Sequence, residues 1–171
     1  YDDYQYFFWG DVNGDQRNDL IFLPVSGSSD TYDMVFLLSI CNGGWEFHLQ
    51  SFPELANLIG YIPLLGDVNR DGRTDFIYSD FSSESETKLT TLLSGTAQGW
   101  QIKQQTIKPE GLSHIMKGDL IGDANHDGYW DVLLIGGSIP FTLLKQNASL
   151  TYSNVANNIT FPSGLPAANM H

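Results

Sequence analysis

A six-residue motif recurs three times along the chain at a constant spacing. Gly-Asp-Val-Asn-Gly-Asp occupies residues 10–15, and related segments occupy residues 66–71 and 122–127. The second copy therefore follows the first at the same distance along the chain as the third follows the second. Repeats of this length are typical of solenoids, propellers and other arrays of one structural unit. The spacing predicts three successive copies of one supersecondary unit.

Each motif opens a nine-residue acidic loop with oxygen-bearing side chains at alternate positions. We call residues 11–19, 67–75 and 123–131 the first, second and third acidic loops; positions 1, 3, 5 and 9 are Asp, Asn, Asp and Asp in all three. Calcium takes six to eight oxygen ligands, and such loops supply them from alternate side chains and a backbone carbonyl at position 7. We therefore expect up to three Ca²⁺ ions. The expected ligands are Asp11, Asn13, Asp15, Arg17 (carbonyl) and Asp19; Asp67, Asn69, Asp71, Arg73 (carbonyl) and Asp75; and Asp123, Asn125, Asp127, Tyr129 (carbonyl) and Asp131.

Position 6 of such a loop needs a positive φ, which glycine adopts without steric cost. Gly72 and Gly128 meet this requirement in the second and third loops. The first loop has Gln16 there, with Gly14 two positions earlier. We expect the first loop to be strained, reshaped or weaker in calcium binding.

An apolar run follows each acidic loop, and short strands are expected between clusters of Gly, Asn, Asp and Ser. One short helical turn is expected at residues 55–59, after Pro53. The repeats place the units at residues 1–60 and 61–116, a partial unit at 117–150, and a loop or linker tail at 151–171. The expected strands cover residues 7–9, 20–23, 34–38, 45–49, 62–65, 76–78, 89–93, 100–103, 120–121, 132–135 and 143–144.

Two Gly-Trp corners strengthen the repeat. Trp45 and Trp100 each follow a glycine, and their separation is one residue shorter than the spacing of the acidic motifs. We expect them to pack neighbouring units together; the alternative is that they form aromatic platforms for sugar rings. Four short strands per unit of this length is the pattern of a β-propeller blade.

The flanking residues distinguish these loops from two helical calcium motifs. An EF-hand carries a bidentate Glu at position 12, where this chain has Phe22, Tyr78 and Leu134. Strands are expected after each loop, which also excludes the dockerin module. The pattern Asp-x-Asn-x-Asp-Gly-x-x-Asp before an apolar strand instead resembles the FG-GAP/VCBS repeat family, over about residues 5 to 145. This resemblance implies an all-β fold with three blades of an integrin-α-like β-propeller, each with a calcium-binding loop before a strand.

Composition narrows the possible partners. The 171 residues carry a net charge of −12, which argues against nucleic acid and anionic membrane surfaces as partners. Nine of the 20 acidic residues lie in the three loops, and three divalent cations would halve the net charge. No run of about 18 apolar residues occurs, so no transmembrane helix is expected. Cys41 is the single cysteine, so no internal disulfide can form.

No enzyme is expected from the motifs, and the resemblance implies an extracellular or cell-surface location. No hydrolase, metalloprotease or phosphate-loop motif is present. Two sequons, at Asn147 and Asn158, are candidate glycosylation sites. The absence of an initiator methionine or signal peptide before Tyr1 predicts a mature product or a fragment.

Function rests on the resemblance, which implies a calcium-stabilised extracellular module that recognises a protein or a glycan. Two alternatives stay open: a non-catalytic propeller segment of a secreted enzyme or toxin, and a structural component of a large assembly. Propellers usually close with four to eight blades. Three units therefore predict that further blades come from a longer chain or from a second copy.

Overall fold

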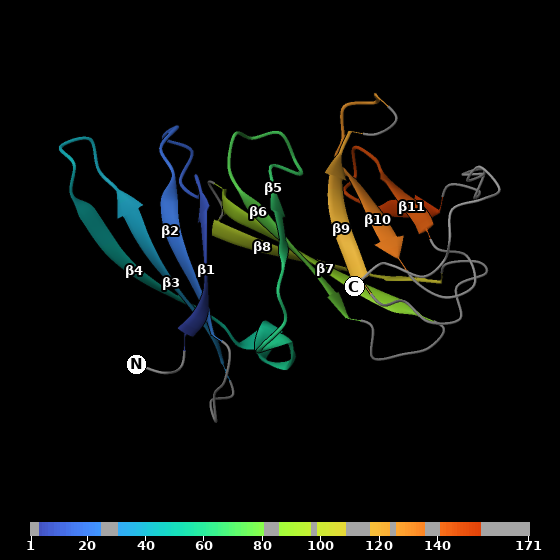
Figure 1. Ribbon diagram of the computed structural model, residues 1–171, viewed down its shortest axis with the longest axis horizontal. Helices are drawn as coiled ribbons and strands as arrows, with labels where there is room; N and C mark the ends of the chain where they lie inside the picture. The colour runs from blue at the N-terminus through green and yellow to red at the C-terminus, as the bar shows by residue number, and fades with distance from the viewer. Residues whose placement is uncertain are drawn as a thin grey trace, which may run out of the picture.

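A computed structural model describes residues 4–24, 31–80, 86–96, 99–108, 117–123, 126–135 and 141–154. Within these ranges the regular structure is almost entirely β-strand, which confirms the all-β prediction. The strands form three antiparallel sheets of four strands each, and in every sheet the spatial order follows the chain order. Figure 1 shows the three sheets in succession across the molecule.

The first sheet contains β1 (Tyr4–Gly10), β2 (Asp19–Pro24), β3 (Tyr32–Ser39) and β4 (Trp45–Phe52). The second contains β5 (Leu64–Gly66), β6 (Asp75–Asp80), β7 (Thr87–Thr96) and β8 (Gly99–Ile107). The third contains β9 (Lys117–Gly122), β10 (Asp131–Ile135), β11 (Phe141–Gln146) and β12 (Tyr152–Asn154). A short 3₁₀ helix, η1 (Pro53–Leu58), links the first two sheets and matches the expected helical turn.

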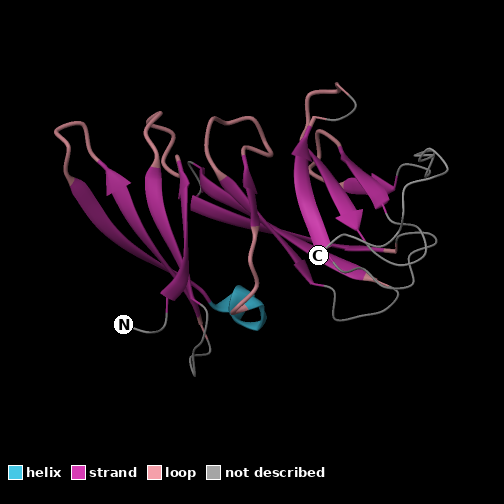
Figure 2. Cartoon of the chain, viewed as in Figure 1, coloured by secondary structure: helices cyan, strands magenta, loops and turns pink. Residues whose placement is uncertain are grey.

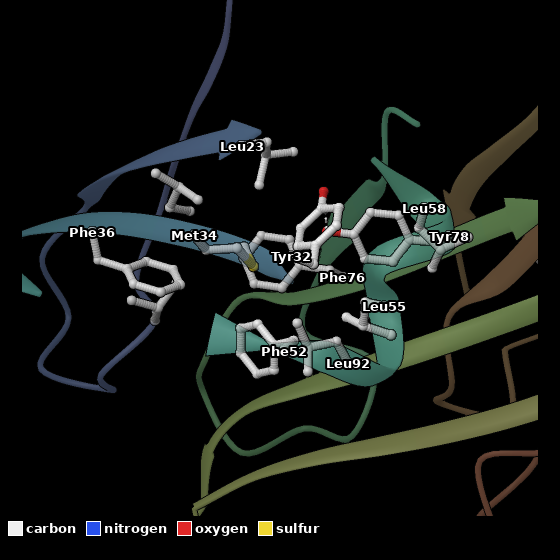
Figure 3. Packing of buried hydrophobic residues seen from close by; sticks show 12 residues of the cluster. Leu23, Tyr32, Met34, Phe36, Phe52, Leu55, Leu58, Phe76, Tyr78 and Leu92 are labelled. Carbon is white, nitrogen blue, oxygen red and sulfur yellow. Dashed lines mark hydrogen bonds between the residues drawn. The ribbon is translucent and has the colours of Figure 1, made fainter. Parts of the chain in front are cut away.

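One apolar core lies between the first and second sheets. Its buried side chains come from both sheets, from η1 and, in the case of Val12, from the first acidic loop. Figure 3 shows these side chains together. Tyr32 and Tyr78 meet there edge to face, with ring centroids 5.7 Å apart and hydroxyl oxygens at 3.2 Å. This bond links two hydroxyls that would otherwise be buried without a partner, which would cost stability. The buried members are Val12, Ile21, Leu23, Tyr32, Met34, Phe36, Phe52, Leu55, Leu58, Phe76, Tyr78 and Leu92.

A second core joins the second sheet to the third. Ile77, Leu89 and Leu93 of the second sheet are buried there with Val132 and Tyr152 of the third. Phe76 and Tyr78, on either side of Ile77, point into the first core instead. Successive strand residues face opposite sides of a sheet, so β6 buries both of its faces. The second sheet is therefore sandwiched between the other two.

Trp100 sits in the contact between the first two sheets, as expected for a packing residue. Its ring stacks on Phe36 at 5.3 Å and meets Phe52 edge to face at 5.4 Å. Trp45, its counterpart in the first sheet, is instead 50% exposed. The Trp45 ring lies beside that of the neighbouring Trp9, with the two centroids 6.3 Å apart.

The third unit is more complete than expected. Residues 151–171 are predicted to be a loop or linker, but β12 begins at Tyr152 and pairs with β11. The reason is a contact with the second sheet: the Gln105 side chain accepts a hydrogen bond from the Tyr152 backbone N–H and donates one to the Tyr152 carbonyl, both at 2.7 Å. Local composition carries no signal of a partner 47 residues away in the sequence. Residues 155–171, including the sequon at Asn158, lie outside the described residues.

Among the described residues, no helix has the length and apolar character needed to cross a membrane.

Candidate metal centre

The three acidic loops lie along one edge of the molecule. Each connects the first two strands of its sheet, and Figure 2 shows these connections at the upper edge of all three sheets. Neighbouring units also contact each other at this edge. Thr74 of the second loop donates its backbone N–H to the Asp11 carbonyl of the first at 2.6 Å. Gln146 of the third sheet donates from Nε2 to the Val68 carbonyl of the second loop at 3.0 Å.

The aspartate at position 1 holds each loop in the same way. Its Oδ2 accepts the backbone N–H of position 6, at 2.6 Å in the first loop, 2.9 Å in the second and 2.7 Å in the third. Its Oδ1 accepts the N–H of position 5, at 3.2, 3.0 and 2.9 Å respectively. These carboxylates, Asp11, Asp67 and Asp123, therefore lie inside the curve of their own loop.

The side chains at positions 3 and 5 also turn toward the loop backbone. Asp15, Asp71 and Asp127 accept the N–H of position 7 at 2.9, 3.0 and 3.0 Å. Asn13 and Asn69 accept the N–H of position 5 at 2.9 and 3.1 Å. Asn125 lies outside the described residues. Two different loop sequences thus place three oxygen-bearing side chains alike, and the third loop agrees at positions 1 and 5.

The aspartate at position 9 is the fully buried carboxylate of each loop. Asp19, Asp75 and Asp131 each have 0% exposed surface. Oδ1 of each accepts a backbone N–H from the third strand of its sheet, namely Ser39 (2.9 Å), Ser94 (2.9 Å) and Gln146 (3.2 Å). Oδ2 of Asp19 and Asp75 accepts from position 2, Val12 and Val68, at 3.0 and 3.1 Å. Position 9 therefore fastens the loop to its own sheet.

Burial makes the negative charge at position 9 costly. It raises the pKa of Asp75 to about 7, although the N–H groups of Ser94 and Val68 act in the opposite direction. The nearby carboxylates of Asp71 and Asp67 raise this pKa further. Burial likewise raises the pKa of Asp19, again opposed by its two backbone bonds. A divalent cation beside these carboxylates would offset both desolvation and mutual repulsion.

Among its described residues, each loop has two in the left-handed region, one more than the sequence indicated. Position 6 has φ of 66° at Gln16, 81° at Gly72 and 91° at Gly128. Position 4 is also left-handed, with φ of 80° at Gly14, 65° at Arg70 and 59° at His126. Every loop thus contains one glycine and one other residue at these two positions. The first loop was expected to be strained or reshaped, but its backbone is like that of the other two. It has its glycine at position 4 and its non-glycine residue at position 6, whereas the other loops have the opposite order.

Replacing Gly72 with alanine should destabilise the protein by about 1–2 kcal/mol, the cost of left-handed backbone for a residue with a Cβ. No atom lies within 4 Å of the added Cβ, so this strain is the whole effect. The matched change Gln16→Gly relieves the same strain and should raise stability. Urea unfolding of both variants measures this; equal midpoints for the two would contradict the assignment of left-handed backbone.

Side chains at positions 4 and 7 connect neighbouring loops. Arg70 of the second loop lies 5.0 Å from the Tyr129 ring of the third, in a cation–π contact. Arg73 of the second loop reaches the first, where its Nε would lie 2.8 Å from a Cβ placed on Gly14. Arg17 pairs with Asp15 inside the first loop. These cationic side chains balance the negative charge of the loops, which the sequence did not indicate.

The donor set suits calcium, but the side chains are not gathered around a point. Each loop offers carboxylate, amide and carbonyl oxygens, the ligands that calcium prefers. Each carboxylate oxygen that accepts one N–H still has a lone pair. Within the described ranges, no three Asp, Glu, His or Cys side chains are arranged as a ready metal site. A cation would therefore have to draw the oxygens of a loop inward.

The strand residues that bind position 9 were missed in the sequence. Ser39 and Ser94 have the same separation along the chain as Trp45 and Trp100. That shared offset was the available signal, although nothing in the residue type pointed to it. Asn147, the described sequon residue, is exposed in a turn where its Oδ1 accepts the Ser149 N–H at 2.9 Å.

No protein-family model matches the chain, and no curated protein sequence matches it significantly.

Proposed function

We propose that the chain is a calcium-stabilised extracellular binding module built as part of a β-propeller, in which each acidic loop binds one Ca²⁺. The module recognises a protein or glycan ligand and has no catalytic role. The calcium ions act as structural clips that hold the loop edge of the sheets in a fixed shape.

The observation that carries the proposal is the common arrangement of carboxylates in loops of different sequence. Positions 1 and 5 accept the same backbone N–H groups in all three loops. Position 9 adds a buried carboxylate in each, and the pKa of Asp75 is raised by burial and by its acidic neighbours. Asp and Asn can form turns without a metal. A turn does not require a third, buried carboxylate, and burying its negative charge costs folding free energy. A bound cation would compensate that cost.

Calcium titration followed by calorimetry tests the metal sites. The chain, freed of metal by chelation, should bind up to three Ca²⁺ with dissociation constants of about 10⁻⁴–10⁻³ M, the range of extracellular modules. Asp71→Ala should remove one site because it deletes a ligand from the second loop. Asp33→Ala is the matched control: it removes the same charge from β3, where Asp33 accepts a bond from Ser51 Oγ at 2.5 Å. Absence of calcium binding, or equal loss in both variants, would refute the metal sites.

The recognition role requires a separate measurement. Binding of the intact chain to arrayed glycans and to extracellular matrix proteins should be stronger with calcium than with chelator, since the loop edge is ordered by the metal. Asp71→Ala should weaken this binding and Asp33→Ala should not. If the chain binds calcium but binds none of the arrayed glycans or matrix proteins, the recognition role is overturned. The module would then have a structural role alone.

A further inference from the structure

The outer face of the first sheet is an exposed apolar surface, which we call the open face. It is the side of the sheet opposite the first core. Soluble proteins seldom expose contiguous apolar surface without a partner. Its most exposed side chains are Phe7 (60%), Trp9 (56%), Trp45 (50%), Phe47 (64%) and Leu49 (57%).

Strand register orders the open face into rows across all four strands. Trp9 pairs with Leu20, Leu20 with Leu37, and Leu37 with Phe47. Residues paired directly across antiparallel strands share a face, so these four form one continuous apolar row. A second row lies beside it, made of Phe7, Phe22, Val35 and Leu49.

The second sheet contains the same row, and there the row is covered. Leu65 pairs with Phe76, Phe76 with Leu92, and Leu92 with Ile102. All four belong to the first core or pack against it, facing the first sheet. The two rows correspond position by position at the spacing of the acidic motifs or one residue less. The corresponding pairs are Trp9 and Leu65, Leu20 and Phe76, Leu37 and Leu92, and Phe47 and Ile102.

The sheets therefore associate head to tail. Each sheet has a leading face, which contacts the preceding sheet, and a trailing face, which contacts the following one. Ile21 and Ile77 occupy equivalent positions of the repeat and are both on trailing faces: Ile21 is buried against the second sheet and Ile77 against the third. The open face is the leading face of the first sheet, with no preceding sheet on it within the described chain.

The third sheet has the complementary face. Val132 is buried in the second core and so lies on the leading face of β10. Leu133, the next residue, faces the opposite side and is partly exposed. The register pairs Leu133 with Leu143, and Ile135 with Phe141. All four residues are of apolar type. The first sheet thus has an open leading face, and the partly exposed Leu133 lies on the trailing face of the third sheet. These are the two kinds of face that meet between the sheets inside the chain.

We propose that the open face docks the trailing face of the third sheet of a second copy of this chain. The contact repeats the packing already present between the first and second sheets, including a place for Trp45 equivalent to that of Trp100. A head-to-tail contact closes into a ring or continues as a filament. Two copies provide six sheets, within the range of four to eight found in closed propellers, and each copy then covers the open face of the other.

Solution mass tests this pairing. In sedimentation equilibrium at micromolar concentration the intact chain should have about twice its mass of 19.0 kDa. Phe47→Asp on the open face and Leu133→Asp on the third sheet should each give the single-chain mass. His48→Asp is the matched control, since His48 is also exposed on β4 but lies on the opposite face. Retained strand content in circular dichroism shows that each variant still folds; Leu49→Asp replaces Phe47→Asp if it does not.

Mixing the two variants identifies the geometry. The Phe47→Asp copy retains an intact third sheet, and the Leu133→Asp copy retains an intact open face. An equimolar mixture should therefore regain the doubled mass through one intact contact, although more weakly than the original chain. A doubled mass for Leu133→Asp alone would mean that two open faces meet each other, which overturns the head-to-tail contact. A mixture that stays at single-chain mass would overturn it as well, because the one intact contact should hold the two variants together. A single-chain mass for the unchanged protein overturns the pairing altogether, and larger multiples overturn the closed pair.

The pairing rests on apolar contacts and not on the proposed calcium sites. The mass is measured in calcium and in chelator, with folding monitored in each. If the pair forms but no calcium binds, only the proposed calcium sites fail. If calcium binds but no pair forms, only the proposed pairing fails. Because each copy has a net charge of −12, the pair should strengthen at higher ionic strength, where charge repulsion is screened.

Discussion

Thermal unfolding in about 10 mM calcium should occur on the order of 10–30 °C above unfolding in excess chelator. A ligand that binds only the folded state stabilises it by RT ln(1 + [L]/Kd). Calcium at 10 to 100 times a dissociation constant typical of extracellular modules gives about 1.4–2.7 kcal/mol for each site. Three sites together give about 4–8 kcal/mol, and each kcal/mol shifts the midpoint of a protein of this size by about 2–4 °C.

Variants in and outside the loops separate metal binding from loop structure. Asp71→Ala should lose about one third of the calcium-dependent shift, because the first and third loops stay intact. In chelator it should cost about 1 kcal/mol for the lost bond to the Arg73 N–H, at 3.0 Å. Asp33→Ala should keep the full shift. Magnesium should stabilise less, since it requires near-octahedral geometry and gives up its water reluctantly. Identical midpoints in calcium and chelator would rule out the structural role of the metal.

Replacing Phe76 with alanine should destabilise the protein by about 3–5 kcal/mol. The Phe76 side chain is completely buried in the core between the first and second sheets, and its ring lies 6.2 Å from that of Trp100. Removal leaves a cavity lined by both sheets, which cannot close without moving one sheet against the other. Denaturant unfolding in calcium measures the change, because the shift in midpoint at constant slope reports stability.

Phe47→Ala provides the matched control on the open face. Both changes remove a phenyl ring from a strand, but Phe47 is 64% exposed and Phe76 is fully buried. At protein concentrations low enough to separate two copies, Phe47→Ala should change stability by about 0.5 kcal/mol or less. At higher concentrations its cost should grow as the pair forms. Equal costs for Phe76→Ala and Phe47→Ala in dilute protein would contradict the placement of the core.

Much of the fold could be predicted from sequence patterns that span only a few residues. Alternation of apolar residues and the Gly, Asn and Asp clusters located most of the strands, and Pro53 with Gly60 located the one helical turn. These signals work because strand and turn formation depend on neighbours within a few residues. Composition failed at β12, whose residues carry no strong strand signal. Contacts with Gln105 in the second sheet stabilise that strand.

The same contrast between local sequence signals and contacts between sheets applies to the acidic loops of the candidate metal site. Ligand order within each short loop is local, so the sequence could indicate which side chains turn inward. The left-handed backbone at Arg70 and His126 was not indicated, because glycine is the residue type that signals it. The contact of Arg70 with the Tyr129 ring joins two loops and depends on how the sheets pack. The calcium ions remain a prediction of the residue pattern.

The sequence by itself determined the period of the repeat, the all-β class and the composition of the acidic loops, because each can be recognised from short segments of the chain. Only the tertiary structure decided which face of each sheet is covered. Tyr32 meets Tyr78 across 46 residues, and Gln146 reaches the Val68 carbonyl across 78. Leu20 and Phe76 occupy equivalent strand positions, yet Phe76 is buried while Leu20 lies on the open face. Both positions are apolar in the repeat, so their sequence does not distinguish them. Phe76 is buried because the first sheet packs against its face, whereas no described sheet covers the face that carries Leu20.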